Sequence, residues 1–374
     1  MSCSGEYIHA PTDSSPWSEC VTSLVTDLKY RFPARYLACW GALVLLAVIV
    51  AIVVPVTFNP NGIKVVTSLA GVLALASMGQ MLIVMLGAID LSVPAIIMAS
   101  AGIVVHFGTP GASLPPIVLL ALAVAVVISL GNWVFITRLG LNSIITTLAT
   151  LGIVTGAMAW WTGVSFSLTG RAPEALQTLA NRSVLNLSAS FLVALVVAGL
   201  LALVLSRTRG GRQLAAIGTN RRAARFQGVR VVRIEFTAFA AAGLLYGIAG
   251  VLVAGIVGSP DTSIGAPYQL ATITAVAIAG TAFSGGPASV ASVVGACVFL
   301  QLLDQALTIH GLAAGPRVVA QGVALVVAIS AITLGQYALS GLRWSTRSFR
   351  QVAGSDQLEG LESSTQPAKM KETR

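Results

Sequence analysis

Asp90 places a carboxylate inside an otherwise apolar stretch, GQMLIVMLGAIDLSV at residues 79–93, with Gln80 and Ser92 as polar neighbours. A charged side chain at the centre of a membrane helix costs at least about 2.5 kcal/mol on insertion scales. Two interpretations are open. Either Asp90 lines a translocation path or forms a polar lock between helices with Gln80 and Ser92, or it lies at a membrane edge and caps the helix that follows.

Other polar or conformationally special residues interrupt the apolar runs. Most polar residues in such runs are hydrogen-bond partners between helices. The segment GTAFSGGP at 280–287 has no Lys and no phosphate-loop pattern, and its glycines permit close approach of backbones, so it predicts a helix break. The candidate residues for a substrate path or helix break are Gln80, Asp90, Ser92, Asn142, Thr146, Gly280, Thr281, Gly285 and Gly286.

The sequence offers no set of residues for catalysis or metal binding. The 4 cysteines form no CxxC pair and no metal-ligand spacing, and the 3 histidines stand in separate contexts. No phosphate-binding loop and no Ser/His/Asp set is present. We therefore expect no enzyme activity, no metal and no cofactor in this chain. No basic patch with interleaved aromatic residues points to nucleic acid.

The composition predicts an integral membrane protein. Of 374 residues, 56% are hydrophobic and 9% are charged, whereas soluble domains contain about 25% charged residues. The apolar runs are continuous and about twenty residues long, which is typical of membrane helices rather than barrel strands. The fold class expected is an all-α polytopic bundle of about ten transmembrane helices. The predicted spans are approximately 36–58, 65–86, 89–107, 117–137, 142–161, 187–205, 236–257, 270–283, 290–309 and 318–334.

The charges predict the orientation in the membrane. We expect tails at 1–35 and 336–374 on either side of a membrane domain at 36–335. Of the 22 Lys and Arg residues, 18 fall on the side of the tails and 4 on the other side. Because cytoplasmic loops are enriched in Lys and Arg, both tails are predicted to be cytoplasmic.

The loop at 207–233 is the most basic segment, with eight arginines. Residues 213–217 predict a short amphipathic helix stopped by Gly218, and Asn220 predicts a cap for a second short helix, 221–226, stopped by Gly228. Apolar residues that give these helices an edge are Leu214, Ile217 and Phe226. The loop is either a solvated connection held inside by its charge or a docking pair for a cytoplasmic partner.

The basic loop resembles a segment of a known protein family. GRQLAAIGTNRRAARFQGV at 211–229 is similar to the cytoplasmic coupling segment of ribose-type sugar permeases, the membrane subunits of bacterial ATP-binding-cassette importers. Three further stretches, at 79–93, 141–157 and 268–296, resemble family segments in the same order. The resemblance covers about 65–331.

The resemblance implies a transport subunit in the bacterial inner membrane. It implies partners: an ATPase that binds ATP and Mg²⁺, a periplasmic or lipid-anchored sugar-binding protein, a second permease copy or paralogue, and membrane lipid. The substrate implied is a monosaccharide, pentose or hexose. The residues implied in coupling to the ATPase are Gly211, Arg212, Ala216, Gly218, Asn220, Ala224 and Gly228.

Two alternative functions stay open. In the first, the same machinery imports an autoinducer, a nucleoside or a branched-chain amino acid. In the second, the chain is an ion-coupled secondary transporter.

The sequence also departs from the family's pattern at two places. Pro94 replaces the family's usual Gly, which affects the start of the third span. Arg221 and Arg222 stand where the family usually has an acidic residue, which suggests a partner ATPase with a matching acidic or differently charged dock.

Overall fold

The computed structural model describes residues 34–108, 111–162, 170–327 and 330. The predicted tails fall almost wholly outside these residues. The elements up to residue 162 are α2 (Ala34–Val53), the 3-10 helix η1 (Pro55–Phe58), α3 (Pro60–Met85), α4 (Val93–Phe107), α5 (Leu114–Trp133), the π-helix η2 (Val134–Arg138) and α6 (Ser143–Thr162). The later elements are α7 (Glu174–Asn181), β1 (Ser183–Val184), β2 (Leu187–Ser188), α8 (Ala189–Arg207), α9 (Arg209–Thr219), α10 (Arg221–Phe226), α11 (Val231–Val257), α12 (Ala266–Ile278) and α13 (Val290–Ile309).

The all-helical membrane fold is confirmed. Six helices of the described chain are long and apolar enough to cross a membrane: α3, α5 with η2, α6, α8, α11 and α13. Four shorter apolar helices are Cys39–Val53, Val93–Phe107, Ala266–Ile278 and Ala314–Val327. Each predicted span overlaps one of these ten helices. The end of the tenth predicted span lies largely outside the described residues.

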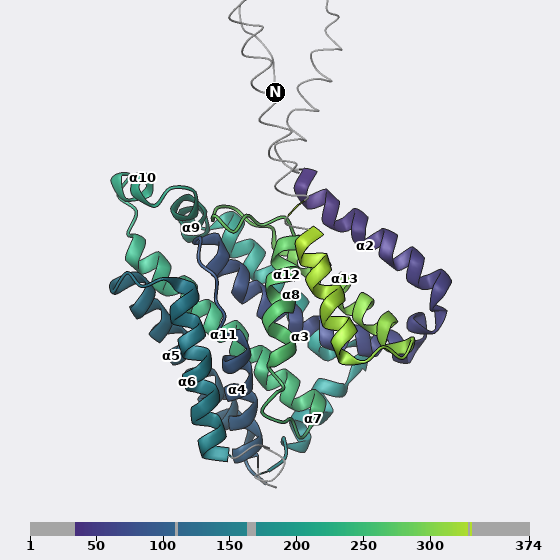
Figure 1. Cartoon of the computed structure of the whole chain (residues 1–374). Helices are drawn as coiled ribbons and strands as arrows, with labels where there is room; N and C mark the ends of the chain where they lie inside the picture. Colours follow the sequence, from purple (N-terminus) through teal and green to yellow (C-terminus); the bar gives the residue numbers. More distant parts are fainter. Residues whose placement is uncertain (1–33, 109–110, 163–169, 328–329, 331–374) are drawn as a thin grey trace, which may run out of the picture.

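Helix α3 forms the centre of the bundle. In its most apolar window 94% of the residues are buried inside the protein, against 17% for α6. It packs against α8, α11, α12 and α13. Two glycines allow the closest approaches, because a Cβ on Gly71 would lie 2.6 Å from the backbone of Phe191 and one on Gly79 would meet the Tyr246 ring. Figure 1 shows α2 and α13 on one side of this core and α5 and α6 on the other.

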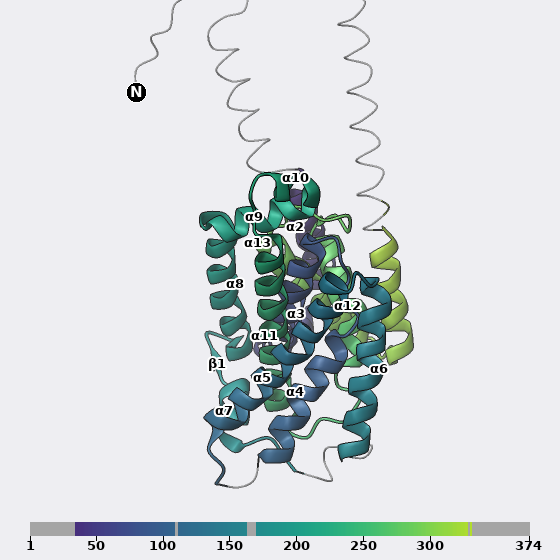
Figure 2. The same cartoon turned by 90° about the vertical axis from the view of Figure 1, so that its left-hand side faces the viewer.

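The two ends of the bundle carry different structures. Helices α9 and α10 lie at one end, and α7 lies near the opposite end with the β1–β2 hairpin (Figures 1 and 2). The polar stretch 162–186 thus contains an unpredicted helix, α7, which buries Leu176 and Ala180. The Asn181 amide Nδ2 donates to the carbonyl of Gly255 at 3.2 Å, which ties α7 to α11.

Two non-helical breaks separate consecutive helices, and the helices on either side of each break are called an interrupted helix pair below. Residues 86–92 separate α3 from α4, and residues 279–289 separate α12 from α13 without helix. With 15 and 13 residues, α4 and α12 reach only about 22 and 20 Å, less than the roughly 30 Å of the hydrocarbon core. The break predicted from the glycines at 280–287 is confirmed.

The predicted start of the third span, at Ile89, is wrong. Helix α4 begins at Val93, so Pro94 lies in its first turn instead of inside a helix. Proline is tolerated there because a first-turn N–H has no partner within the helix. This position explains how the chain accommodates Pro94. Gly265, just before α12, packs against Pro94. A Cβ on Gly265 would overlap the Pro94 carbonyl oxygen.

Candidate functional site

In the segment 86–92, the N–H groups of residues 86–88 donate to carbonyls in the last turn of α3. Those of residues 89–92 have no acceptor in a helix and need other partners. Gln80 supplies two. In the orientation that pairs both amide atoms, its nitrogen donates to the Asp90 carbonyl at 3.0 Å and its oxygen accepts from the Asp90 N–H at 3.2 Å. The hydroxyl of Tyr246 on α11 lies 3.4 Å from the same amide. Gln80 and Tyr246 are completely buried, so α3 and α11 together hold Asp90 in place.

Helix α6 supplies partners on the other side of the segment. The Ile89 N–H donates to Ser143 Oγ at 3.4 Å. The Leu91 N–H donates to Thr147 Oγ1 at 2.9 Å. Together with the Ser92 N–H, which donates to Asp90 Oδ1 at 2.8 Å, four consecutive backbone donors are paired with side chains. This pairing explains why the segment is stable without forming a helix.

A directed chain of hydrogen bonds ends at the Asp90 carboxylate. Thr150 Oγ1 donates to Asn132 Oδ1 at 2.6 Å, and Asn132 Nδ2 donates to Ser92 Oγ at 2.8 Å. Ser92 Oγ in turn donates to Asp90 Oδ1 at 2.6 Å. Asp90 is 1% exposed, and its Oδ2 has no hydrogen-bond partner among the described residues. The geometry therefore brings Gln80, Asp90 and Ser92 together as a polar lock between α3, α5, α6 and α11.

The capping interpretation of Asp90 does not match this geometry. Ser92 is the N-cap residue of α4, and its side chain makes no capping hydrogen bond. The carboxylate bonds to Ser92 itself, and Asp90 is buried within the bundle. The structure therefore does not show the Asp90 carboxylate as the N-cap of α4.

Asn142 and Thr146 are not brought into the network. Asn142 is exposed and caps the start of α6, where its Oδ1 accepts from the Ile144 N–H at 2.9 Å. The Thr146 hydroxyl donates to the Asn142 carbonyl at 2.9 Å, within the same helix. The residues of the network that sequence reasoning missed are Asn132, Ser143, Thr150 and Tyr246. A signal for the two on α6 existed, because Ser143, Thr147 and Thr150 share one helix face by their i, i+4 and i+7 spacing.

The second break places its glycines at the turns that need them. Gly280 has a φ of +80° at the end of α12, while Gly285 and Gly286 have φ of +95° and +116°. L-residues with a side chain rarely adopt these conformations. Thr281 is 1% exposed, and its N–H donates to the Val276 carbonyl at 3.3 Å.

Helix α9 differs in two ways from its prediction. It runs from Arg209 to Thr219 and is capped by Thr208, whose Oγ1 accepts from the Gly211 N–H at 3.2 Å. It does not stop at Gly218, which lies inside the helix. Among the predicted coupling residues here, Gly211 is buried against Leu205, Ala216 is half-buried and Arg212 is exposed.

Helix α10 matches its prediction in bounds and in caps. Asn220 Oδ1 accepts from the Ala223 N–H at 3.0 Å, and Gly228 has a φ of +78° just beyond the end. Ala224 is buried in a small apolar cluster with Ile217 and Val231. The side chain of Phe226, in contrast, is 92% exposed. The predicted apolar edge therefore divides, with Leu214 and Ile217 facing the bundle and Phe226 facing away from it.

The contacts of Arg221 bear on the hypothesis of an acidic dock on the partner ATPase. Its guanidinium forms a two-pronged ion pair with Glu235 on α11, with Nε–Oε1 at 2.8 Å and Nη2–Oε2 at 3.0 Å. The charge of Arg221 is thus compensated within the chain, and an acidic dock on a partner is not needed to explain it. The neighbouring Arg222 is exposed.

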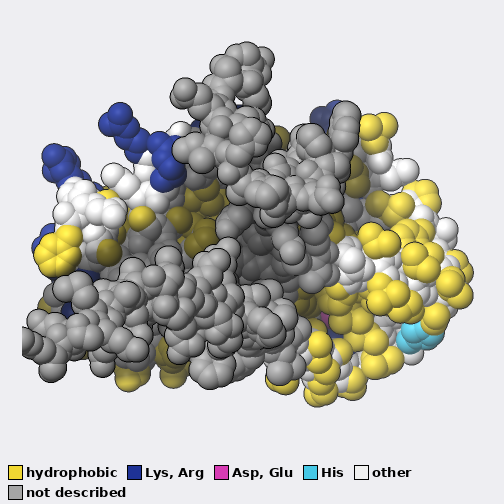
Figure 3. Space-filling view, turned by 90° about the horizontal axis from the view of Figure 1, so that it is seen from above, with side chains coloured by type: hydrophobic (Ala, Val, Ile, Leu, Met, Phe, Trp, Pro, Cys, Tyr) yellow, Lys and Arg dark blue, Asp and Glu magenta, His cyan; other side chains and the backbone are white. Residues whose placement is uncertain are grey.

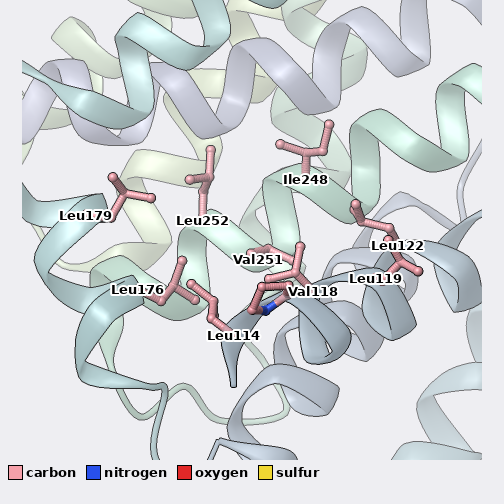
Figure 4. Close-up of a pocket in the computed structure, with 10 residues that line it drawn as sticks. Leu114, Val118, Leu119, Leu122, Leu176, Leu179, Ile248, Val251 and Leu252 are labelled. Carbon is pink, nitrogen blue, oxygen red and sulfur yellow. The ribbon is translucent and has the colours of Figure 1, made fainter. Parts of the chain in front are cut away.

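The end of the molecule that carries α9 and α10 presents Arg side chains beside exposed hydrophobic ones (Figure 3). A pocket near the α7 end of the bundle has a different character (Figure 4). Aliphatic residues of α5, α7 and α11 line it, including Leu114, Val118, Leu176 and Leu252. It contains none of the candidate residues, and its lining offers a polar solute no hydrogen-bond partner.

These features define a class of protein: a multi-pass helical membrane protein with interrupted helices and a capped helix pair at one end of the bundle. Comparison with known proteins agrees. Residues 62–333 match the family described as branched-chain amino acid transport system / permease component. The chain belongs to this family of ATP-binding-cassette importer permeases, of the ribose type that the sequence resembles.

Relatives with curated functions include two kinds of import permease. The chain is 30% identical over 289 residues to the autoinducer 2 import system permease protein LsrC of Enterobacter sp. (strain 638), covering 77% of this chain and 82% of the relative. It is 26% identical over 288 residues to the ribose import permease protein RbsC of Bacillus subtilis (strain 168), covering 77% of this chain and 89% of the relative.

Proposed function

We propose that this chain is the membrane subunit of an importer that moves a monosaccharide, a pentose or a hexose, into a bacterial cell across the inner membrane. A separate ATPase, which binds ATP and Mg²⁺, drives the transport. A periplasmic or lipid-anchored binding protein delivers the sugar, and a second permease copy or paralogue completes the pore. Both termini and α9–α10 are cytoplasmic, as the 18 to 4 distribution of basic residues favours.

The observation that carries this proposal is the α9–α10 pair. Two helices, each capped by its own side chain, are packed on the bundle through Leu214, Ile217 and Ala224. The opposite side presents Phe226, 92% exposed, with the exposed Arg222 and Arg225 on the same short helix. An exposed aromatic residue among arginines has the composition of a protein-binding hot spot. A connection between two membrane spans requires none of these features.

The pair would act as a rigid lever. Closure of two ATPase subunits on ATP would push α9–α10 and reorient the bundle as a rigid body between outward and inward access. Polar side chains on the path would give the sugar hydroxyls partners during passage. Met85, five residues before Asp90, contacts Gly218 of α9, so the lock at Asp90 is the best-supported site for such a rearrangement.

The substrate class rests on the relatives. One relative is named for ribose import and another for autoinducer 2 import, so a furanosyl compound of autoinducer type is the second candidate substrate. A thermal-shift screen of the cognate binding protein with pentoses, hexoses, autoinducer-type furanosyl compounds, nucleosides and branched-chain amino acids would assign it. An ion-coupled secondary transporter disagrees with the family to which the chain belongs.

Replacement of Phe226 tests the docking assignment. Phe226→Ala should weaken binding of the ATPase to the detergent-purified permease at least about 30-fold, since hot-spot truncations cost 2 kcal/mol or more. Its unfolding temperature should not change, because the side chain is exposed. Gln227→Ala, at the exposed neighbouring position, is the matched control and should bind like the parent chain. Equal affinity of the parent and Phe226→Ala chains would contradict the docking assignment.

A further inference from the structure

Three segments that are far apart in the sequence meet at the end of α9. They are the end of α3 with the residue pair that follows it, 85–87, the last turn of α9, 218–219, and the second helix break at 284–286. The Gly286 N–H donates to the Met85 carbonyl at 3.0 Å, which joins the two interrupted helix pairs directly. A single contact region therefore connects α9 to both helix breaks.

Gly218 is the residue of α9 in this contact. A Cβ at this position would overlap the Met85 carbonyl oxygen and lie 2.5 Å from the Gly286 nitrogen. Glycine inside a helix costs about 1 kcal/mol relative to alanine. The close approach of three backbones explains why glycine is needed here in spite of that cost, and it replaces the predicted role of Gly218 as a helix stop.

The opposing surfaces are also glycine. A Cβ on Gly285 would lie 2.6 Å from the Gly218 carbonyl oxygen and 3.1 Å from the Gly87 nitrogen. Gly285 has a φ of +95° and Gly87 a φ of +78°, so both also need glycine for their conformation. The four residues Gly87, Gly218, Gly285 and Gly286 are called the glycine joint below.

No side chain separates the three backbones at the glycine joint. Side chains absorb small displacements by changing rotamer, whereas backbones in contact cannot. A shift of α9 must therefore shift Met85 and Gly286. Met85 leads into the segment that contains Asp90, and Gly286 lies in the middle of the break between α12 and α13.

We infer that the glycine joint is the positioning element through which α9 moves both interrupted helix pairs at once. This inference rests on the proposed function, because it assigns the residues that transmit the ATPase movement. Docking and transmission are then separate: Phe226 binds the partner on the outer side of α10, and Gly218 passes the movement inward from α9.

Gly218→Ala tests the inference, and Gly210→Ala is the matched control. Both positions lie in α9, but a Cβ on Gly210 would only come within 3.7 Å of Thr208 Oγ1, an ordinary contact. Each full-length variant is assembled with its ATPase and binding protein in proteoliposomes. ATPase binding, ATP hydrolysis and uptake of labelled ribose, or of the sugar found in the thermal-shift screen, are measured together.

We expect Gly218→Ala to bind the ATPase and hydrolyse ATP within about twofold of the parent complex, while uptake per ATP falls at least tenfold (about 1.4 kcal/mol for each tenfold). Gly210→Ala should match the parent in all three measurements. Uptake per ATP within twofold of the parent for Gly218→Ala would overturn the inference, and so would an equal loss in both variants. Absence of ATP-dependent uptake in the parent complex would instead overturn the proposed function.

A second measurement covers the case in which Gly218→Ala does not assemble. Hydrogen exchange in the parent complex is compared with and without ATP and vanadate. If the glycine joint transmits movement, exchange in segments 86–92 and 279–289 should change together when the nucleotide is trapped. Unchanged exchange in either segment, with a change in α9, would contradict the inference.

Discussion

At the scale of single residues, the Asp90 carboxylate is held by hydrogen-bond donors and not by a cation. In the described part of the chain it bonds to the N–H and the hydroxyl of Ser92 and to no Lys or Arg. A buried acceptor that organises donors can do so without a full charge. The role of Asp90 as a lock therefore depends on its Oδ1, and a role in the substrate path would depend on its charge or on Oδ2.

Replacing Asp90 separates these two roles. Asp90→Asn keeps an Oδ1 that accepts both bonds from Ser92 but places amide N–H donors where Oδ2 has no partner. We therefore expect a smaller loss of thermal stability in detergent than for Asp90→Leu, with uptake retained. Asp90→Leu leaves two buried donors of Ser92 unpaired, at about 1–3 kcal/mol each, and should lower the unfolding temperature by several degrees and abolish uptake. A stable Asp90→Asn variant without uptake would show that the charge itself is needed and that the lock alone does not explain the residue.

At the scale of secondary-structure elements, the α9–α10 pair shows which features sequence patterns can predict and which they cannot. Asn220 and Gly228 act as helix caps from local chemistry alone, and both were predictable. The close backbone packing of Gly218 was not, because its neighbours Met85 and Gly286 are more than sixty residues away in the chain. The same holds for Arg221, whose partner Glu235 lies on the next helix.

The Arg221–Glu235 pair should stabilise the attachment of α10 to α11. The Glu235 side chain is 7% exposed and that of Arg221 is 49% exposed, so Arg221→Ala leaves a buried carboxylate without its main partner. We expect a loss of about 1–2 kcal/mol, because half of the pair is solvated. Arg222→Ala on the same helix should cost less than about 0.5 kcal/mol. The unfolding temperatures of the two variants decide this, and equal values would refute the pair's structural role.

The fold at the scale of the whole molecule was largely predictable, since apolar runs of about twenty residues identify membrane helices. The element α7 was not, because eight residues, half of them polar, give too short a pattern, and its burial depends on Gly255 and its neighbours on α11. The candidate site was predictable in part. Asp90, Gln80 and Ser92 are close in sequence, whereas Asn132 and Thr150 join them only through the packing of α5 and α6.

The central claim is that this bundle imports its substrate only with energy from a separate ATPase. Proteoliposomes that contain the permease, the ATPase and ATP on the cytoplasmic face test it, with labelled sugar and the binding protein on the other face. We expect uptake that requires ATP, the binding protein and a catalytically active ATPase, and that persists when ion gradients are collapsed. Uptake that continues without the ATPase and stops when the ion gradient is collapsed would contradict it.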